Sequence, residues 1–188
     1  MYDNAELFRY IGELGCMREE ASRILLSGPF SAFLASVCRK LYPDAGIVAV
    51  TDRADVLDAA SEEDEKLEKV LMPFNEYKGT GFDVAVSVLA VNTLDTRELT
   101  PYLFSLHDAL NGGGNLYLSF PSSGKISPYP KKLVDSWYSM DEKVYMKRYT
   151  PEDVIMALSI IGFDVKAIES DDNPDLGKVT SIHAVKRS

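Results

Sequence analysis

The sequence predicts an α/β protein in which a mostly parallel sheet carries helices on both faces. Short apolar runs typical of strands alternate with amphipathic runs typical of helices, and this alternation is the order that builds parallel sheets. One strand candidate, residues 47–50, is fully apolar, as expected of a strand covered on both faces. Near the end of the chain, residues 163–168 and 179–185 are separated by a short polar turn and should pair as an antiparallel hairpin.

The first third of the chain is predicted to hold an N-terminal helix, within residues 1–22, followed by a strand–helix–strand unit. Residues 5–14 repeat apolar side chains at helical spacing, and residues 24–26 form the first strand. The next helix is predicted to begin at Ser31 as its N-cap and to end at Pro43. Its inward stripe would consist of Phe33, Leu34, Val37 and Leu41.

The middle of the chain is predicted to hold a charged helix and two strands. Residues 55–69 favour a helix with a weak apolar stripe. Residues 70–72 form a possible third strand, which Pro73 ends. Residues 82–89 form the strongest strand of the chain, and this strand follows a turn at residues 79–81.

A long helix follows, and its start carries two signals. Asp95 with Glu98 has the spacing of a capping box, while Thr100 before Pro101 offers a second cap with proline at the first helical position. Glycines 112–114 should end this helix before a strand at residues 115–120.

The last helix is predicted to begin at Thr150–Pro151 and to stop at Gly162. Before it lies an aromatic, proline-containing insertion, residues 121–149, which follows no helix or strand pattern. Insertions at the carboxyl edge of a sheet often form a lid over a site, but they also pack over that edge without a role in binding. Both interpretations of the insertion stay open.

Composition narrows the class of protein. At 188 residues the chain is expected to form one domain, residues 1–188, with a substantial core. Its net charge of −9 argues against nucleic-acid binding, which draws most of its affinity from neutralising phosphates. No apolar run approaches the roughly 18 residues that a membrane helix needs, and the first residues do not resemble a signal peptide. We therefore expect a cytoplasmic protein without a membrane partner.

Metal and thiol chemistry are not expected. His107 and His183 are the two histidines, and neither has a cysteine or histidine at ligand spacing. Cys16 and Cys38 form no CxxC motif and are expected to be reduced thiols.

A candidate nucleotide site follows the first two strands. A tight turn at Gly28 ends the first strand, and Asp52 ends the second, where a carboxylate can accept both hydroxyls of a ribose. Phe30 stands where such a turn usually needs a bare backbone, so the glycine-rich motif is incomplete.

Several short motifs, in order, resemble those of the class I S-adenosylmethionine-dependent methyltransferases, especially the small-molecule enzymes often called type 11. The motifs are residues 81–87, 110–116, 149–152 and 161–163, together with the closing hairpin. The resemblance covers nearly the whole chain and implies a Rossmann-like fold. It implies a mostly parallel, seven-stranded sheet whose last strand is antiparallel.

The resemblance also implies where S-adenosylmethionine would bind. Gly28, Phe30 and Ala32 fall on the three glycines of the family motif, and Leu26 falls where an acid commonly precedes them. The cofactor-binding residues implied are Ser27, Gly28, Phe30, Asp52, Phe74, Val88 and Asn92. No catalytic residue is implied, because methyl transfer from a sulfonium mainly needs alignment of donor and acceptor.

Two functions are consistent with these residues. The first is an S-adenosylmethionine-dependent methyltransferase acting on a small-molecule acceptor, with Asp52 on the ribose. The second is a non-catalytic binding or subunit protein of the same fold, in which Phe30 blocks the cofactor pocket and apolar surface is offered elsewhere to a protein partner or a second copy.

Overall fold

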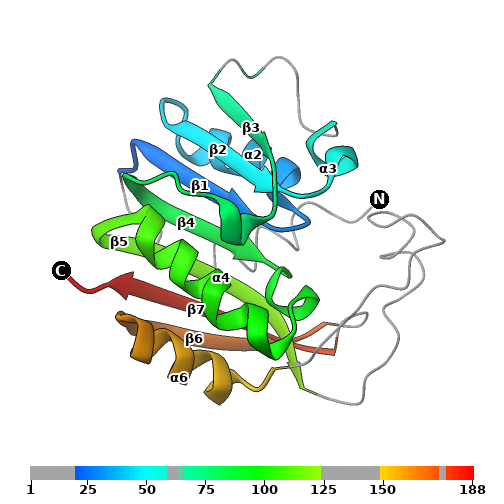
Figure 1. The fold of residues 1–188 in the computed structure, drawn as a ribbon, viewed down its shortest axis with the longest axis vertical. Helices are drawn as coiled ribbons and strands as arrows, with labels where there is room; N and C mark the ends of the chain where they lie inside the picture. Colours follow the sequence, from blue (N-terminus) through cyan, green and yellow to red (C-terminus); the bar gives the residue numbers. More distant parts are fainter. Residues whose placement is uncertain (1–19, 59–63, 65, 124–148, 174–176) are drawn as a thin grey trace.

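The computed structural model describes residues 20–58, 64, 66–123, 149–173 and 177–188 (Figure 1). Its strands are β1 (Arg23–Ser27), β2 (Gly46–Thr51), β3 (Leu67–Leu71), β4 (Phe82–Val88), β5 (Leu110–Ser123), β6 (Phe163–Asn173) and β7 (Gly177–Lys186). They form one seven-stranded sheet in the order β3-β2-β1-β4-β5-β7-β6. β7 runs antiparallel to both of its neighbours, whereas the pairs from β3 to β5 are parallel. The predicted fold class, including the reversed last strand, is confirmed.

Helices cover both faces of this sheet, as predicted. They are α2 (Ser31–Leu41), α3 (Ala54–Asp58), α4 (Thr96–Ala109) and α6 (Pro151–Ile161), with 3-10 turns η1 (Phe74–Glu76) and η2 (Val91–Thr93). α4 and α6 lie side by side on one face, and α2 and α3 lie on the other (Figure 1). Alternate residues of β1 enter the two cores: Leu25 packs on the α4 side, and Ile24 and Leu26 pack on the α2 side.

The helix predicted over residues 55–69 is confirmed at its start and wrong at its end. α3 ends at Asp58, and Leu67 already begins β3. Residues 67–71 pair in parallel with β2, which matches Leu67 with Ile47 and Val70 with Val50. The charged residues of this segment favour a helix locally, but pairing with a buried strand outweighs that weak preference.

The predicted start of α2 is also wrong. Phe30 is the N-cap and makes no side-chain cap hydrogen bond, and Ser31 lies inside the helix. The Ser31 hydroxyl is buried and has no hydrogen-bond partner within the described residues. The inward stripe is confirmed for Leu34 and Val37, but Leu41 is 47% exposed. The helix ends there, so its last residue turns away from the sheet.

Of the two start signals of α4, the upstream one is used. The Asp95 carboxylate accepts hydrogen bonds from the backbone of Arg97 and Glu98, and the Glu98 carboxylate accepts one from the backbone of Asp95. Pro101 therefore lies inside the helix, so the predicted cap at Thr100 is wrong. A complete capping box satisfies several terminal N–H groups at once, whereas Pro101 withholds a single one.

The predicted boundaries of α6 are confirmed. The Thr150 hydroxyl accepts from the backbone of Asp153 at 3.2 Å, and the Asp153 carboxylate accepts from the backbone of Thr150. At the other end Gly162 adopts φ +119°, the left-handed conformation that favours glycine after a helix.

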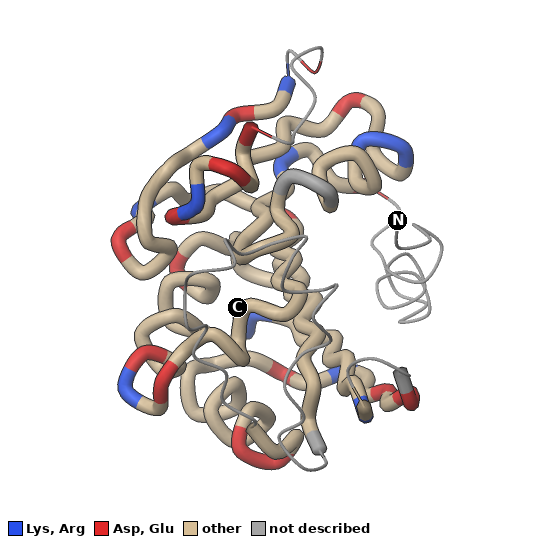
Figure 2. The backbone as a smooth tube through the Cα atoms, turned by 90° about the vertical axis from the view of Figure 1, so that its right-hand side faces the viewer, with Lys and Arg blue, Asp and Glu red and all other residues tan. Residues whose placement is uncertain are grey.

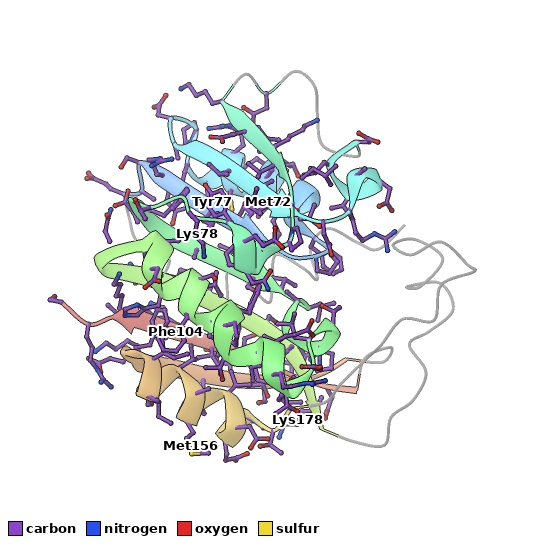
Figure 3. All side chains as sticks on the ribbon, viewed as in Figure 1. Met72, Tyr77, Lys78, Phe104, Met156 and Lys178 are labelled. Atoms are coloured by element: carbon purple, nitrogen blue, oxygen red, sulfur yellow. The ribbon has the colours of Figure 1, made fainter. Side chains whose placement is uncertain are left out.

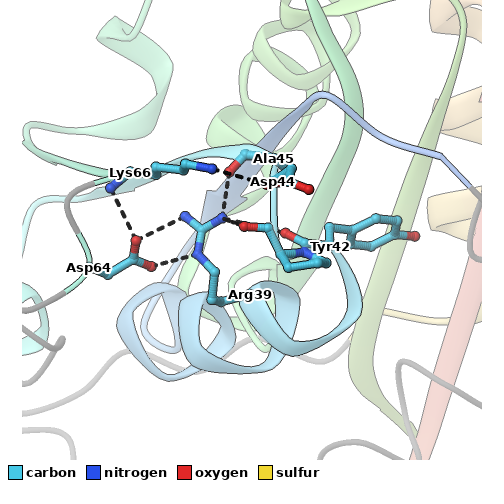
Figure 4. A network of polar contacts seen from close by, with 7 residues as sticks. Arg39, Tyr42, Asp44, Ala45, Asp64 and Lys66 are labelled. Carbon is cyan, nitrogen blue, oxygen red and sulfur yellow. Dashed lines mark hydrogen bonds and ion pairs between the residues drawn. The ribbon is translucent and has the colours of Figure 1, made fainter.

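Charged side chains tie the amino edge of the sheet together. The Arg39 guanidinium, at the end of α2, pairs with both carboxylate oxygens of Asp64 at 3.0 Å (Figure 4). It also donates to the backbone carbonyl groups of Tyr42, Pro43 and Ala45. The Arg39 hydrogen bonds hold the pKa of Asp64 below its ordinary value. One side chain thus fixes the turn between α2 and β2 and joins it to the start of β3.

A second group of hydrogen bonds lies at the same edge and is centred on Asp83, near the start of β4. One oxygen of Asp83 accepts hydrogen bonds from the backbone and hydroxyl of Ser22 and from the backbone of Arg23, and the other accepts from Asn111. Partial burial raises the pKa of Asp83, but these hydrogen bonds outweigh burial and lower it. Asp83 therefore connects the amino ends of β1, β4 and β5.

We predict that Thr150→Ala lowers the free energy of unfolding by about 0.5–2 kcal/mol, because it removes the cap of α6. Thr100→Ala is the matched control, since Thr100 is exposed within α4 and alanine favours helices. Urea titrations followed by circular dichroism measure both. Equal losses in the two variants would contradict the cap assignment.

We predict that Arg39→Ala lowers the free energy of unfolding by about 1.5–3 kcal/mol, the range for hydrogen bonds to charged groups. The substitution removes the hydrogen-bond donor of three backbone carbonyl groups and of the Asp64 carboxylate. Lys66→Ala is the control, since the Lys66–Asp44 pair is exposed and such pairs contribute about 0–1 kcal/mol. The Arg39 variant should also lose less stability as the pH falls below the ordinary aspartate pKa, because the pKa of Asp64 is less depressed without its largest cause, the Arg39 hydrogen bonds. A cost of Lys66→Ala that equals the cost of Arg39→Ala would refute the role given to Arg39.

Candidate functional site

The candidate site lies at the carboxyl edge of the sheet, where the strand order reverses. β1 and β4 are neighbours, yet β1 leads to α2 on one face and β4 leads to α4 on the other. Loops that diverge in this way open a crevice in which α/β proteins bind ligands. Figure 2 looks onto this edge and shows charged residues mostly around its periphery, with few at its centre.

Gly28 and Asp52 emerge at this edge together, as predicted. β1 and β2 are parallel, and their register matches Ser27 with Val50, so the residues after both strands leave the sheet at the same end. Gly28 has φ +96°. A Cβ atom at this position would lie 2.6 Å from the Cβ of Ala90, a distance that real Cβ atoms essentially never show. Both the backbone conformation and the lack of space therefore demand glycine here.

The loop after β4 is held in a strained conformation beside this turn. Leu89 has φ +58° and is the only non-glycine residue with positive φ among those described. An L-residue in this region costs about 1–2 kcal/mol, and such strain often marks functional sites. The backbone N–H of Leu89 donates to Ser119 at 2.8 Å, which helps to hold the strained residue in place. The chain turns sharply after β4, and this turn places Ala90 directly against Gly28.

Asp52 presents an available carboxylate at the edge. It is exposed, and no hydrogen bond or ion pair joins it to another described residue. The neighbouring guanidinium of Arg53 pairs with Asp55 at 2.6 Å, so it is directed along α3. A carboxylate in this state can accept two hydroxyl donors from a ligand without first losing a partner.

Phe30 is part of the core. It is only 4% exposed and belongs to the apolar cluster on the α2 side, with Leu26 and Leu34. Its ring therefore occupies the interior at the start of α2, where a glycine would leave space. Leu26 lies in the same cluster, so this position holds a buried apolar side chain and no acid.

Ser27 is directed into the core on the other face. Its hydroxyl oxygen lies 2.6 Å from the Tyr102 hydroxyl oxygen, which lies equally close to the hydroxyl of Ser87. All three side chains are buried, and burial raises the pKa of Tyr102 to about 12. This hydroxyl cluster joins α4 to the carboxyl ends of β1 and β4. The Ser27 side chain is thus part of the α4-side core, and its hydroxyl is already engaged.

Phe74, Val88 and Asn92 are buried near the carboxyl ends of β3 and β4. Phe74 packs against the ring of Tyr102, with 5.0 Å between the ring centroids. Val88 ends β4 in the α2-side cluster. The Asn92 side-chain amide donates to the backbone carbonyl of Pro121 at 3.0 Å. The structure thus places all seven residues of the candidate set on or beside the ends of β1 to β4, but Asp52 alone among them exposes a charged group.

The 3-10 turn η2 organises this region through contacts that no local sequence pattern indicates. The predicted start of the insertion at residue 121 is wrong, because β5 continues to Ser123. The Asn92 side-chain amide donates to the carbonyl of Pro121, the first residue of the predicted insertion, and the hydroxyl of Tyr149, its last residue, donates to the carbonyl of Leu94 at 3.0 Å. Both ends of the predicted insertion are therefore joined to the segment after β4. Residues 124–148 of the insertion, like the expected N-terminal helix over residues 5–14, lie outside the described residues. The sequence signal that could have found Tyr102 was a single tyrosine among the inward leucines of α4, together with a serine at or near the end of each of two apolar strands.

Other chemistries find no support in the described part of the chain. His107 lies in α4 and His183 in β7, and no cluster of three metal-binding side chains occurs there. Burial raises the pKa of the Cys38 thiol to about 12, which removes it as a nucleophile. Within the same residues no helix is long and apolar enough to span a membrane.

Comparisons with known proteins place the fold. No model of a protein family matches the chain, and no curated protein matches it in sequence. The solved structure of the pyocyanin biosynthetic protein PhzM matches with a TM-score of 0.70 and 17% identity, over 97% of this chain and 55% of that one. The chain thus spans about half the length of that protein.

Two further structures contain S-adenosylhomocysteine. The 1,6-didemethyltoxoflavin-N1-methyltransferase of Burkholderia thailandensis, which also holds 1,6-didemethyltoxoflavin, matches with a TM-score of 0.70 and 16% identity, over 98% of this chain and 76% of that one. The N-methyltransferase NodS of Bradyrhizobium japonicum matches with a TM-score of 0.70 and 11% identity, over 98% and 86%. Such identities establish the fold alone, and the chain has the Rossmann-like fold of the class I S-adenosylmethionine-dependent methyltransferases.

Proposed function

We propose that this protein binds S-adenosylmethionine at the carboxyl edge of β1, β2 and β4 and transfers its methyl group to a small molecule. One observation carries the proposal: the exposed carboxylate of Asp52 stands beside the Gly28 turn with no protein partner among the described residues. The proposal is supported by two structures of the same fold with bound S-adenosylhomocysteine, the methyltransferases from Burkholderia thailandensis and Bradyrhizobium japonicum.

The residues present fit such a cofactor in part. Asp52 would accept the hydrogen bonds of the ribose hydroxyls, and the backbone of the Gly28 turn would lie along the ligand. Phe74, Val88 and Asn92 would line the crevice between β1 and β4. Ser27 cannot offer a free hydroxyl, because its oxygen is engaged with Tyr102. At the position of Leu26 the chain offers no acid for the amino group of the methionine portion.

The chemistry needs little more from the protein. A bound sulfonium is already activated for methyl transfer, so the protein has to hold the acceptor atom in line with the methyl group. The proposed acceptor is a small molecule, as for the toxoflavin enzyme of the same fold.

A second function is favoured by one specific observation. The buried ring of Phe30 stands where the family motif has glycine, and it could leave too little room for the cofactor. The chain would then be a non-catalytic protein of the same fold, serving as a binding or subunit partner.

We predict that wild-type protein binds S-adenosylhomocysteine and that Asp52→Ala weakens binding by about 1.5–3 kcal/mol, the range for hydrogen bonds to a charged group. Isothermal titration calorimetry measures the affinity. A melting shift checks it, since ligand at a hundredfold excess over Kd adds about 2.7 kcal/mol of stability. Asp58→Ala is the matched control, because Asp58 is an exposed aspartate nearby, at the end of α3. If wild-type protein shows no binding at millimolar ligand, the non-catalytic function replaces the proposed one.

We predict that Phe30→Gly lowers the free energy of unfolding by about 3–5 kcal/mol, because it leaves a cavity in the α2-side core. Under the proposed function, affinity for S-adenosylhomocysteine does not rise in this variant, since the wild-type site already admits the ligand. A gain in affinity over wild type would instead identify Phe30 as the block. Phe30→Leu keeps most of the core volume and serves as the control for stability.

A further inference from the structure

Exposed apolar side chains gather on the side of the molecule formed by α4, α6 and the edge strand β6. Six large apolar residues of the described chain are exposed, and four of them belong to these elements. They are Phe104 on α4 (46% exposed), Met156 and Ile160 on α6 (59% and 78%) and Ile168 on β6 (49%). Figure 3 shows Phe104 on α4 and Met156 projecting from the flank of α6 that faces away from α4. We call this set the α6 surface.

The outward side of α6 lacks charge over most of its length. Its inward residues Val154, Leu158 and Ile161 are buried, as an ordinary surface helix requires. On the outward side, Met156 and Ile160 follow each other at a spacing of four residues and form a ridge, and the helix carries no charged residue beyond Asp153. A helix that is apolar on its inner and outer sides is typical of a helix covered on both.

The two ends of this ridge carry opposite charge. Glu152 and Asp153 are exposed at the start of α6. Arg187 lies at its end, because its backbone N–H donates to Gly162 and its guanidinium donates to the carbonyl of Phe163 at 3.1 Å. The guanidinium also pairs with Asp164, and about half of the Arg187 side chain stays exposed. An acidic start, an apolar centre and a basic end together make a surface that complements its own image after a rotation of 180°.

We propose that the α6 surface binds a second copy of this chain about a two-fold axis, with the two α6 helices antiparallel. Met156 of each copy then packs against Ile160 of the other, and Glu152 of each copy reaches Arg187 of the other. Antiparallel helices also place opposite ends of their dipoles side by side. The proposal concerns a different face from the candidate cofactor site and does not depend on the proposed function.

The sheet edge itself does not carry this contact. β6 bears Asp164, Lys166 and Glu169 along its free edge, and charges of this kind discourage edge-to-edge pairing of strands. The helices therefore make the contact, with Ile168 and Phe104 at its margins. Four apolar side chains are few beside the roughly 20–30 residues that each side of a typical stable interface contributes, so the association should depend on concentration.

The experiment is sedimentation equilibrium of the full chain, without ligand, over a wide range of concentrations. Wild-type protein should show a monomer–dimer equilibrium. Ile160→Glu should raise the dimer dissociation constant by about tenfold or more, because it buries a charge at the centre of the contact. Leu41→Glu is the matched control, since Leu41 is an exposed leucine at the end of α2, on the other face of the sheet. A monomeric wild type, or a dimer that Ile160→Glu leaves intact, would overturn the proposal.

A charge exchange tests the antiparallel arrangement. Glu152→Arg and Arg187→Glu should each weaken the dimer, and the double variant should regain wild-type association because each pair is restored with reversed sign. Melting curves of all variants show whether the loss of the Arg187–Asp164 pair affects the fold itself. Single variants that weaken the dimer without rescue in the double variant would reject the antiparallel contact. Since no ligand is present, failure here leaves the proposed function untouched, and failure of cofactor binding leaves the dimer untouched.

Discussion

The contact between the Gly28 turn and the loop after β4 is the constraint on which the site depends. Where the strand order reverses, the two loops leave toward opposite faces, and their bases have to be held together. Gly28 allows this because it has no Cβ and accepts φ +96°, so that Ala90 can close against it. On the other side of the same contact, Leu89 adopts a strained φ of +58°. Tyr102 of α4 stabilises this arrangement from the α4 side of the sheet, since its hydroxyl joins Ser27 of β1 to Ser87 of β4.

The two edges of the sheet use polar groups differently. At the amino edge, the side chains of Asp83 and Arg39 form hydrogen bonds within the protein, and these bonds connect strands and turns. At the carboxyl edge, Asp52 keeps its carboxylate exposed, with no such bond to the described residues. The amino ends of the strands are thus joined by half-buried polar groups, while one carboxylate at the carboxyl edge stays exposed. This division agrees with the general location of ligands in open α/β sheets.

The fold narrows the function but does not assign it. Structures of this fold with bound S-adenosylhomocysteine share 11–16% of residues with this chain, so the proposal of cofactor binding rests on Asp52 and the Gly28 turn. The two proposed functions differ in whether the buried ring of Phe30 leaves room for the cofactor. The α6 surface adds a property that does not depend on the choice between them, because a binding protein and an enzyme can both form dimers.

The sequence by itself determined the order of elements, because hydrophobic period and capping chemistry act over a few residues. It placed the capping box at Thr150, the glycine stop at Gly162 and the antiparallel hairpin, and it placed Gly28 and Asp52 at one edge. Only the tertiary structure decided where a distant contact overrides a local preference. Pairing with β2 made a strand of Leu67 to Leu71, although the segment favours a helix. The start of α4 at Asp95 rather than Thr100 was instead a competition between two local signals, and the complete capping box prevailed. The direction of the Ser27 hydroxyl and the burial of Phe30 also depended on the tertiary structure, since Tyr102 and the α2-side core reach them from distant parts of the chain.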